Sequence, residues 1–164
     1  MTLFKQMIVA ACLAALASPA FSLSCIPPDV ARTYEDLHAA PEAYMVVHGT
    51  LTFDESKLPE ADLDNQMDTT PLTKVPARLK GRALSRAGFK TPFDKQITMD
   101  VLCLGPWCAG GISGMNIMAF VESSSSGYTL TLGPCYGYVF EPTAKALEQA
   151  ESCMNGADCT PRDY

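Results

Sequence analysis

Apolar side chains recur at alternate positions in three segments of the chain, which predicts three strands. The segments cover residues 44–53, 72–84 and 97–103. The positions expected to face inward are Met45, Val47, Leu51 and Phe53, then Val75, Ala77, Leu79 and Ala83, then Ile97, Met99, Val101 and Cys103. Gly81 interrupts the second strand, and it is expected to mark a bulge or a close approach of another backbone.

Two shorter strands are predicted nearer the C-terminus, over residues 117–121 and 128–132. The polar segment 122–127 between them is expected to form a hairpin loop. Two other segments lack the alternation. Residues 54–71 are predicted to form a long acidic loop, and residues 85–95, rich in Gly, Pro and basic side chains, a further connection.

Apolar residues at helical spacing occur before and after these strands and predict two helices. Asp29 comes after two prolines and is the predicted N-cap of a short helix with apolar residues at Val30, Tyr34 and Leu37. A second helix is predicted between Pro142 and Asn155, and its apolar face consists of Ala144, Leu147, Ala150 and Met154. Five short strands between two helices predict a mainly β fold, a small closed antiparallel barrel capped by helices.

The first 22 residues have the composition of a secretory signal peptide. Lys5 is their one charge, and the apolar run of 11 residues over 7–17 is shorter than the roughly 20 residues of a membrane helix. The chain is therefore predicted to be exported, to the periplasm or the medium, and not to span a membrane. Small residues permit cleavage after Ala17, Ser22 or Ser24. Cleavage after Ser22 is favoured over the alternatives, including lipid attachment at Cys12, and leaves residues 23–164 as one domain.

Composition and charge exclude several classes of function. The chain has 12 Lys and Arg against 18 Asp and Glu, and its pI near 4.8 argues against a nucleic-acid partner. It has no phosphate-binding glycine loop and no serine in a nucleophile elbow, so neither an enzyme nor a cofactor is predicted. His48 is expected to be a solvated strand residue, and neither it nor His38 has zinc-ligand spacing to a cysteine.

Six cysteines remain once Cys12 leaves with the signal peptide, and in an exported chain they predict three disulfides. They are Cys25, Cys103, Cys108, Cys135, Cys153 and Cys159. The sequence does not choose among the many connectivities that six cysteines allow, although Cys153 and Cys159 are the favoured local pair. The C-x4-C spacing of Cys103 and Cys108 differs from the C-x-x-C of redox enzymes, so no redox site is predicted.

Positive charge is concentrated in one segment. Residues 74–95 contain Lys74, Arg78, Lys80, Arg82, Arg86, Lys90 and Lys95, with Asp94 as the one acid. Alternation places Arg78, Lys80 and Arg82 on the outward face of one strand, which makes them candidate ligands for an anionic glycan, a lipid headgroup or an acidic protein surface. The alternative is a solvated strand surface whose charge is balanced by the acidic loop.

The order of these features resembles the netrin-like module, which includes the inhibitory domain of the tissue inhibitors of metalloproteinases. The shared features are Cys25, the strand ending in Val46-Val-His-Gly-Thr50, the Arg78-Leu-Lys-Gly81 stretch, the Trp107-Cys-Ala-Gly110 turn, Ala119-Phe-Val121, the strand Tyr128-Thr-Leu-Thr-Leu132, Cys135 and a final helix ending near a cysteine. The resemblance covers nearly all of residues 25–159. It implies an OB-type barrel, places Cys108, Cys135 and Cys153 at the module's cysteine positions, and pairs Cys25 with Cys108 or Cys135.

The function expected from these features is that of an exported binding module with an unknown ligand. The metalloproteinase inhibitors begin Cys-x-Cys, whereas this chain has Cys25 alone there, and Cys103 and Cys159 lack counterparts. Two alternatives are an inhibitor that chelates a protease zinc through an N-terminal Cys25, and a structural protein of the cell envelope. The zinc route requires cleavage after Ser24, because a neutral α-amino group must reach the metal.

We expect the mature protein to begin at Leu23 and to contain no free thiol. Its intact mass without reduction should be lower than the reduced mass by about six hydrogens, since each disulfide removes two. N-terminal sequencing and mass spectrometry of protein from its own compartment test both points. A first residue of Cys25 would instead admit the zinc route, and thiol above trace level would contradict three disulfides.

Overall fold

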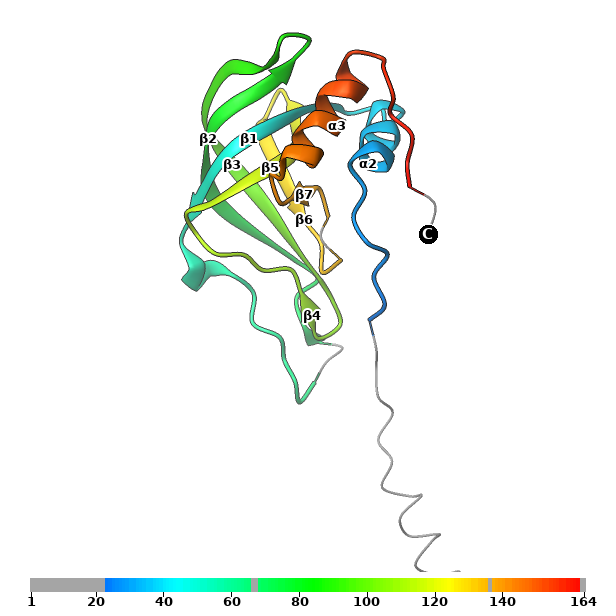
Figure 1. Ribbon diagram of the computed structural model, residues 1–164. Coiled ribbons are helices and arrows are strands. Elements are labelled where there is room, and N and C mark those ends of the chain that lie inside the picture. The colour runs from blue at the N-terminus through cyan, green and yellow to red at the C-terminus, as the bar shows by residue number, and fades with distance from the viewer. Residues whose placement is uncertain (1–22, 66–67, 136, 163–164) are drawn as a thin grey trace, which may run out of the picture.

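The computed structural model describes residues 23–65, 68–135 and 137–162, so the predicted signal peptide lies outside the described residues. Strands dominate, with a helix before and a helix after them (Figure 1). In chain order the elements are α2 (Val30–His38), β1 (Ala43–Phe53), the short 3-10 turn η1 (Glu55–Lys57), β2 (Leu72–Ser85), β3 (Gly88–Leu104), β4 (Trp107–Cys108), β5 (Met115–Ser124), β6 (Gly127–Leu132), β7 (Val139–Phe140) and α3 (Ala144–Met154).

Five strands are hydrogen-bonded into a ring in the order β1-β2-β3-β6-β5, with β5 returning to β1. Four of these pairings are antiparallel, but β3 and β6 run parallel, with Thr98–Val101 beside Thr129–Leu132. The prediction of a wholly antiparallel closed sheet is therefore wrong. The reason is geometric: strand direction cannot alternate all the way round a ring with an odd number of members, so one neighbouring pair must be parallel.

The main hydrophobic core fills the inside of the strand ring. Alternation predicted its inward face correctly for β2 and β3, since Val75, Leu79, Met99 and Val101 are all completely buried. Further members of this core come from β1, β5 and β6, namely Val47, Leu51, Ile117, Ala119, Val121, Leu130 and Leu132. Burial of these side chains is the main favourable term in closing the ring.

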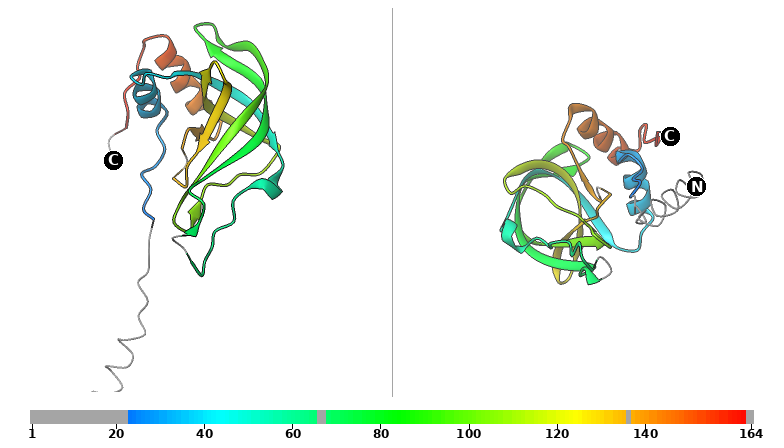
Figure 2. Two further views of the ribbon diagram at one scale, coloured as in Figure 1. Left: turned by 180° about the vertical axis from the view of Figure 1, so that it is seen from behind. Right: turned by 90° about the horizontal axis from the view of Figure 1, so that it is seen from below.

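A second core lies outside the ring, where α2 and α3 pack side by side against β1 and β5 (Figure 2). Val46, on the face of β1 predicted to point outward, is only 3% exposed because the helices cover it. Met118 and Phe120 of β5 are covered in the same way. The strands β1 and β5 are thus buried on both faces, which a simple inward and outward alternation does not describe.

Two predicted connections are shorter than expected. Residues 88–95 are part of β3, so the β2–β3 hairpin turns at Arg86 and Ala87 rather than over residues 85–95. Pro92 is tolerated in the strand because this part of β3 pairs with β2 alone and has a free edge. Likewise the β5–β6 hairpin turns at Ser125 and Ser126, since Ser124 and Gly127 already pair.

The structure contains three disulfides, as predicted. They are Cys25–Cys135, Cys103–Cys108 and Cys153–Cys159. The favoured local pair, Cys153–Cys159, is confirmed. Cys25 pairs with Cys135, which is one of the two partners that the family resemblance implied. Among the described residues, no helix has the length and apolar character needed to cross a membrane.

Two glycines face each other in the pairing of β1 with β2. Gly49 and Gly81 are register partners, and a Cβ built on Gly81 would lie 2.5 Å from the Cα of Gly49. Gly81 therefore marks the predicted close approach. The alternative prediction, a β-bulge at Gly81, is wrong, because the irregularity in the β2–β3 register lies between Ala83 and Leu84.

We expect Gly81→Ala to lower the free energy of unfolding by about 2–3 kcal/mol, since the added methyl group forces the two backbones apart. Gly110→Ala is the matched control, because a Cβ there meets nothing within 4 Å. Urea unfolding of both variants measures the difference. Equal stability of the two variants would show that β1 and β2 can separate at little cost.

Candidate functional site

The predicted basic residues extend along the outer face of β2 and into the β2–β3 hairpin. Two cations of the segment are neutralised within the molecule, because Arg78 Nε lies 2.7 Å from Asp94 Oδ1 and Lys74 Nζ lies 2.8 Å from Asp100 Oδ1. Arg78, one of the three candidate ligands, is thus already engaged. Among the described residues, neither Lys80 nor Arg82 forms an ion pair within 4 Å.

We call residues 80–95 the basic ribbon. It carries five exposed cations and one carboxylate, a net charge of +4 in a chain whose net charge is −6. The cations are Lys80, Arg82, Arg86, Lys90 and Lys95. Arg82 Nη1 donates to the backbone carbonyl of Lys90 at 3.0 Å, which fixes the guanidinium across the two strands without cancelling its charge.

The one carboxylate of the basic ribbon remains ionised. The hydrogen bond from Arg78 is the main reason that the pKa of Asp94 is lowered, and the positive charges of Lys80 and Lys95 lower it further. A second carboxylate approaches from α3, because a Cβ on Gly88 would lie 2.9 Å from Glu151 Oε1. These two acids reduce the positive field of the ribbon but leave cations in excess.

The acidic loop lies at the other end of the strand ring from the hairpin turn (Figure 1). Residues 54–68 carry six carboxylates and one lysine, so the two ends of the molecule have opposite charge. The loop begins at Asp54, directly after Phe53, whose register partner is Ala77, so at about 3.3 Å per residue this end lies roughly 10 Å along β2 from Lys80. From Ala77 to the hairpin turn at Arg86 the distance is roughly 30 Å, about four Debye lengths at physiological salt. The acidic loop therefore acts on Lys80 more strongly than on the cations near the turn.

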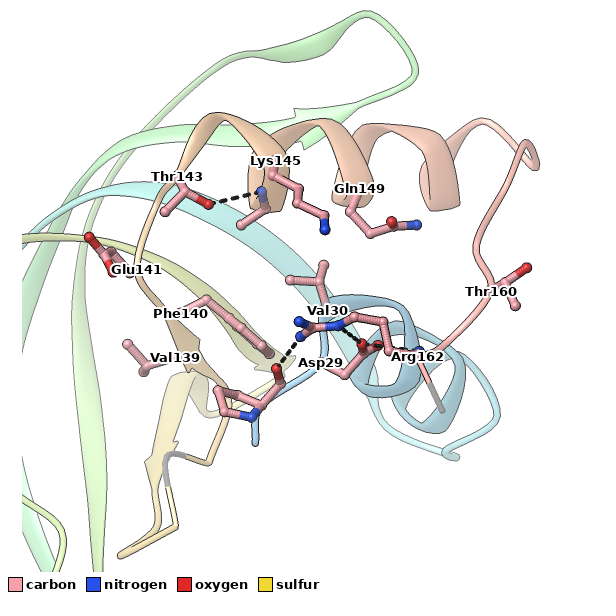
Figure 3. A pocket seen from close by; sticks show the side chains of 12 residues that line it. Asp29, Val30, Val139, Phe140, Glu141, Thr143, Lys145, Gln149, Thr160 and Arg162 are labelled. Carbon is pink, nitrogen blue, oxygen red and sulfur yellow. Dashed lines mark hydrogen bonds and ion pairs between the residues drawn. The ribbon is translucent and has the colours of Figure 1, made fainter. Parts of the chain in front are cut away.

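A cavity lies elsewhere, between the two helices and the C-terminal tail of residues 157–162. It has a volume of about 600 Å³, and the residues that line it come from segments more than 100 residues apart (Figure 3). Val30, Val139 and Phe140 form its apolar side, and Glu141, Thr143 and Lys145 are exposed at its rim. We call it the helix cleft.

An ion pair closes one side of the helix cleft. Asp29, the predicted N-cap, accepts a hydrogen bond from the backbone N–H of Arg32 at 2.9 Å and one from Arg162 Nε at 2.8 Å. Burial alone would raise the pKa of Asp29, but the bonds from Arg162 and Arg32 outweigh it and lower the pKa. Arg162 also donates to the Pro28 carbonyl at 2.8 Å, which ties the tail to the start of α2 (Figure 3).

Other polar groups of the helix cleft are used to hold the tail. Gln149 Nε2 donates to the Asp158 carbonyl at 2.9 Å, and Thr160 Oγ1 donates to Asp158 Oδ1 at 2.8 Å. The sequence identified Asp29 as a cap but gave no signal for its partner, because Arg162 lies 133 residues away. The helix cleft is thus mainly the contact region between the start of α2, α3 and the C-terminal tail.

The histidines do not form part of a reactive cluster. His48 is half-buried rather than solvated, because its Nε2 lies 3.1 Å from Asn116 Nδ2 and its ring contacts Phe89 edge-on. His38 stacks on Tyr34 within α2. Within residues 23–65, 68–135 and 137–162, no group of three or more His, Cys, Asp or Glu side chains is placed to hold a metal ion.

Comparison with known proteins gives no family model, no curated protein and no solved structure that matches this chain.

We expect the ion pair of Asp29 to contribute stability that depends on pH. Because the folded pKa is lowered, this contribution is complete above the unfolded value of about 3.9 and is lost as pH falls through the folded pKa. Asp29→Asn keeps a good N-cap but removes the charge. It should cost about 1 kcal/mol at pH 6 and much less near pH 2.

Urea unfolding of the wild type and Asp29→Asn between pH 2 and pH 6 measures the difference. Asp158→Asn is the comparison, because the pKa of Asp158 is also lowered, but by local hydrogen bonds from Thr160 rather than by an ion pair, so it measures the pH dependence of such bonds alone. A cost of Asp29→Asn that stays constant over this pH range would show that the charge is not responsible.

Proposed function

We propose that this chain is an exported OB-type binding module, without catalytic activity, that binds an anionic partner through the basic ribbon. The observation that carries the proposal is the net charge of +4 on an exposed hairpin of an acidic chain, at the opposite end from the acidic loop. A cluster in which cations outnumber the nearby carboxylates is costly to maintain, and it raises the encounter rate with a partner of opposite charge.

The topology supports the OB-type assignment. A ring of five strands, in which the third pairs in parallel with the fifth long strand, agrees with a Greek-key barrel of this kind. Such barrels bind ligands on the face of their second and third strands. Here that face is the outer side of β2 and β3, which carries Lys80 and Arg82, and α3 covers only its hairpin end at Leu84 and Phe89.

The disulfides support export, because such bonds persist mainly in oxidising compartments. The resemblance to the netrin-like module agrees with this reading, since that module is disulfide-bonded and binds other molecules. An exported protein meets anionic glycans and anionic lipid headgroups. Both offer the same chemistry to the ribbon, an array of negative charges with exposed oxygen acceptors.

One observation favours a second candidate, the inhibitor of zinc proteases. The Cys25–Cys135 disulfide fixes Cys25 to the connection between β6 and β7, as a rigid zinc-chelating terminus would require. The candidate also needs Cys25 to be the first residue of the mature chain. N-terminal sequencing therefore decides it independently of the basic ribbon.

We expect the chain to bind a heparin fragment or vesicles containing phosphatidylglycerol, with an affinity that falls as salt rises. Arg82→Ala with Lys90→Ala should weaken binding about fivefold, because each exposed ion pair contributes up to about 1 kcal/mol. Lys57→Ala with Lys74→Ala removes the same charge from outside the ribbon and should bind like the wild type.

Isothermal titration calorimetry with each probe distinguishes the two sources of negative charge. Binding of heparin alone identifies a glycan, and binding of vesicles alone identifies a lipid headgroup. If both double variants weaken binding equally, total charge rather than the ribbon is responsible, and the proposed site is wrong.

A further inference from the structure

A second cavity opens at the end of the strand ring opposite to the basic ribbon. It has a volume of about 310 Å³ and lies between the ends of β1, β5 and β6 and the segment 108–115. The side chains that line it are apolar, or are those of cysteine and glycine. They belong to Leu51, Phe53, Cys108, Ala109, Gly110, Gly111, Ile112, Met115, Ile117, Leu132, Gly133, Pro134 and Val139. We call this cavity the end pocket.

The end pocket reaches into the main core. Four of its lining residues, Leu51, Ala109, Ile117 and Leu132, are buried members of the core inside the strand ring. At the mouth, Ile112 and Met115 are 65% and 47% exposed. The pocket is thus a passage from solvent to core with no charged side chain along it, and a polar ligand would lose its hydration there without compensation.

The segment over the end pocket is held firmly in place. Ser113 Oγ accepts a bond from the backbone N–H of Phe53 at 2.9 Å, and the Ser113 N–H donates to Glu55 Oε1 at 2.6 Å. The Gly114 N–H donates to the Leu51 carbonyl at 2.7 Å, and the Cys103–Cys108 disulfide lies at the start of the segment. The pocket is therefore formed before any ligand arrives, as is usual for small-molecule sites.

We propose that the end pocket binds a single hydrocarbon chain of an amphiphile, whose head group stays in solvent beyond Ile112 and Met115. The pocket volume is about ten times the share of one water molecule in the liquid, roughly 30 Å³. A flexible chain of several methylene groups fills such a space. The exposed apolar rim of two side chains is far smaller than the roughly 800 Å² per partner of a stable protein interface.

A glycine in the wall of the end pocket supplies the variant that tests it. A Cβ on Gly111 would lie 3.6 Å from Phe53 Cζ, an ordinary contact with the pocket wall. Gly111 does not have a positive φ, so the position accepts another side chain without backbone strain. Ser125 is the matched control position, because it is exposed in the β5–β6 turn and does not line the pocket.

The test uses octyl, decyl and dodecyl maltosides below their micelle concentrations, because their uncharged head group cannot bind the basic ribbon electrostatically. Affinity should rise about three- to fourfold per added methylene until the end pocket is full, and then level off. Gly111→Leu should reduce the affinity at least tenfold, whereas Ser125→Leu adds the same side chain away from the pocket and should leave the affinity unchanged.

Heparin binding by Gly111→Leu, measured alongside, shows whether this variant is folded and keeps the failure of one site distinct from the failure of the other. If Gly111→Leu misfolds, Gly111→Val provides the smaller obstruction at the same position. Affinity that does not depend on chain length, or that is equal in the Ser125 and Gly111 variants, would overturn the proposal.

Discussion

The structure depends on the position of β1, which closes the strand ring. Its residues pair with β2 over Val47–Phe53 and with β5 over Ala43–Leu51, so neither edge of β1 is left open along most of its length. Closure removes the edges that would otherwise offer unpaired backbone groups to another chain. It also creates two hydrophobic cores at once, because β1 contributes Val47 to the inside and Val46 to the helix-covered outside.

Much of this fold was predictable from the local pattern of residues. The inward faces of β2 and β3, the Asp29 cap and the extent of α3 all follow from spacing that a few neighbouring residues define. Two features, the burial of Val46 and the start of β3, depend on long-range packing, and the local pattern did not predict them. Val46 is buried because helices from distant parts of the chain cover it, and β3 begins at Gly88 because a free edge makes Pro92 acceptable.

The candidate sites likewise include features that follow from the local pattern of residues and features that depend on long-range contacts. Alternation placed Arg78, Lys80 and Arg82 on one outer face. The β2–β3 register places Asp94 opposite Lys80, yet the ion pair of Asp94 is formed diagonally with Arg78, which only the side-chain positions show. The helix cleft and the end pocket had no signal in the sequence, because each joins segments that the ring brings together. The segment 108–115, of which the sequence indicated only the Trp107–Gly110 turn, forms a wall of the end pocket because β1 and β6 end beside it.

The three disulfides have very different effects on the covalent topology of the chain. Cys103–Cys108 and Cys153–Cys159 join residues 5 and 6 positions apart, and each removes little freedom from the unfolded chain, about 2 kcal/mol in the chain-entropy description. Cys25–Cys135 joins residues 110 positions apart, which corresponds to about 5 kcal/mol. A reduced and reoxidised chain that recovers only the two local bonds contains two small rings and is otherwise as extensible as the reduced chain, whereas the long bond encloses residues 25–135 in one large ring.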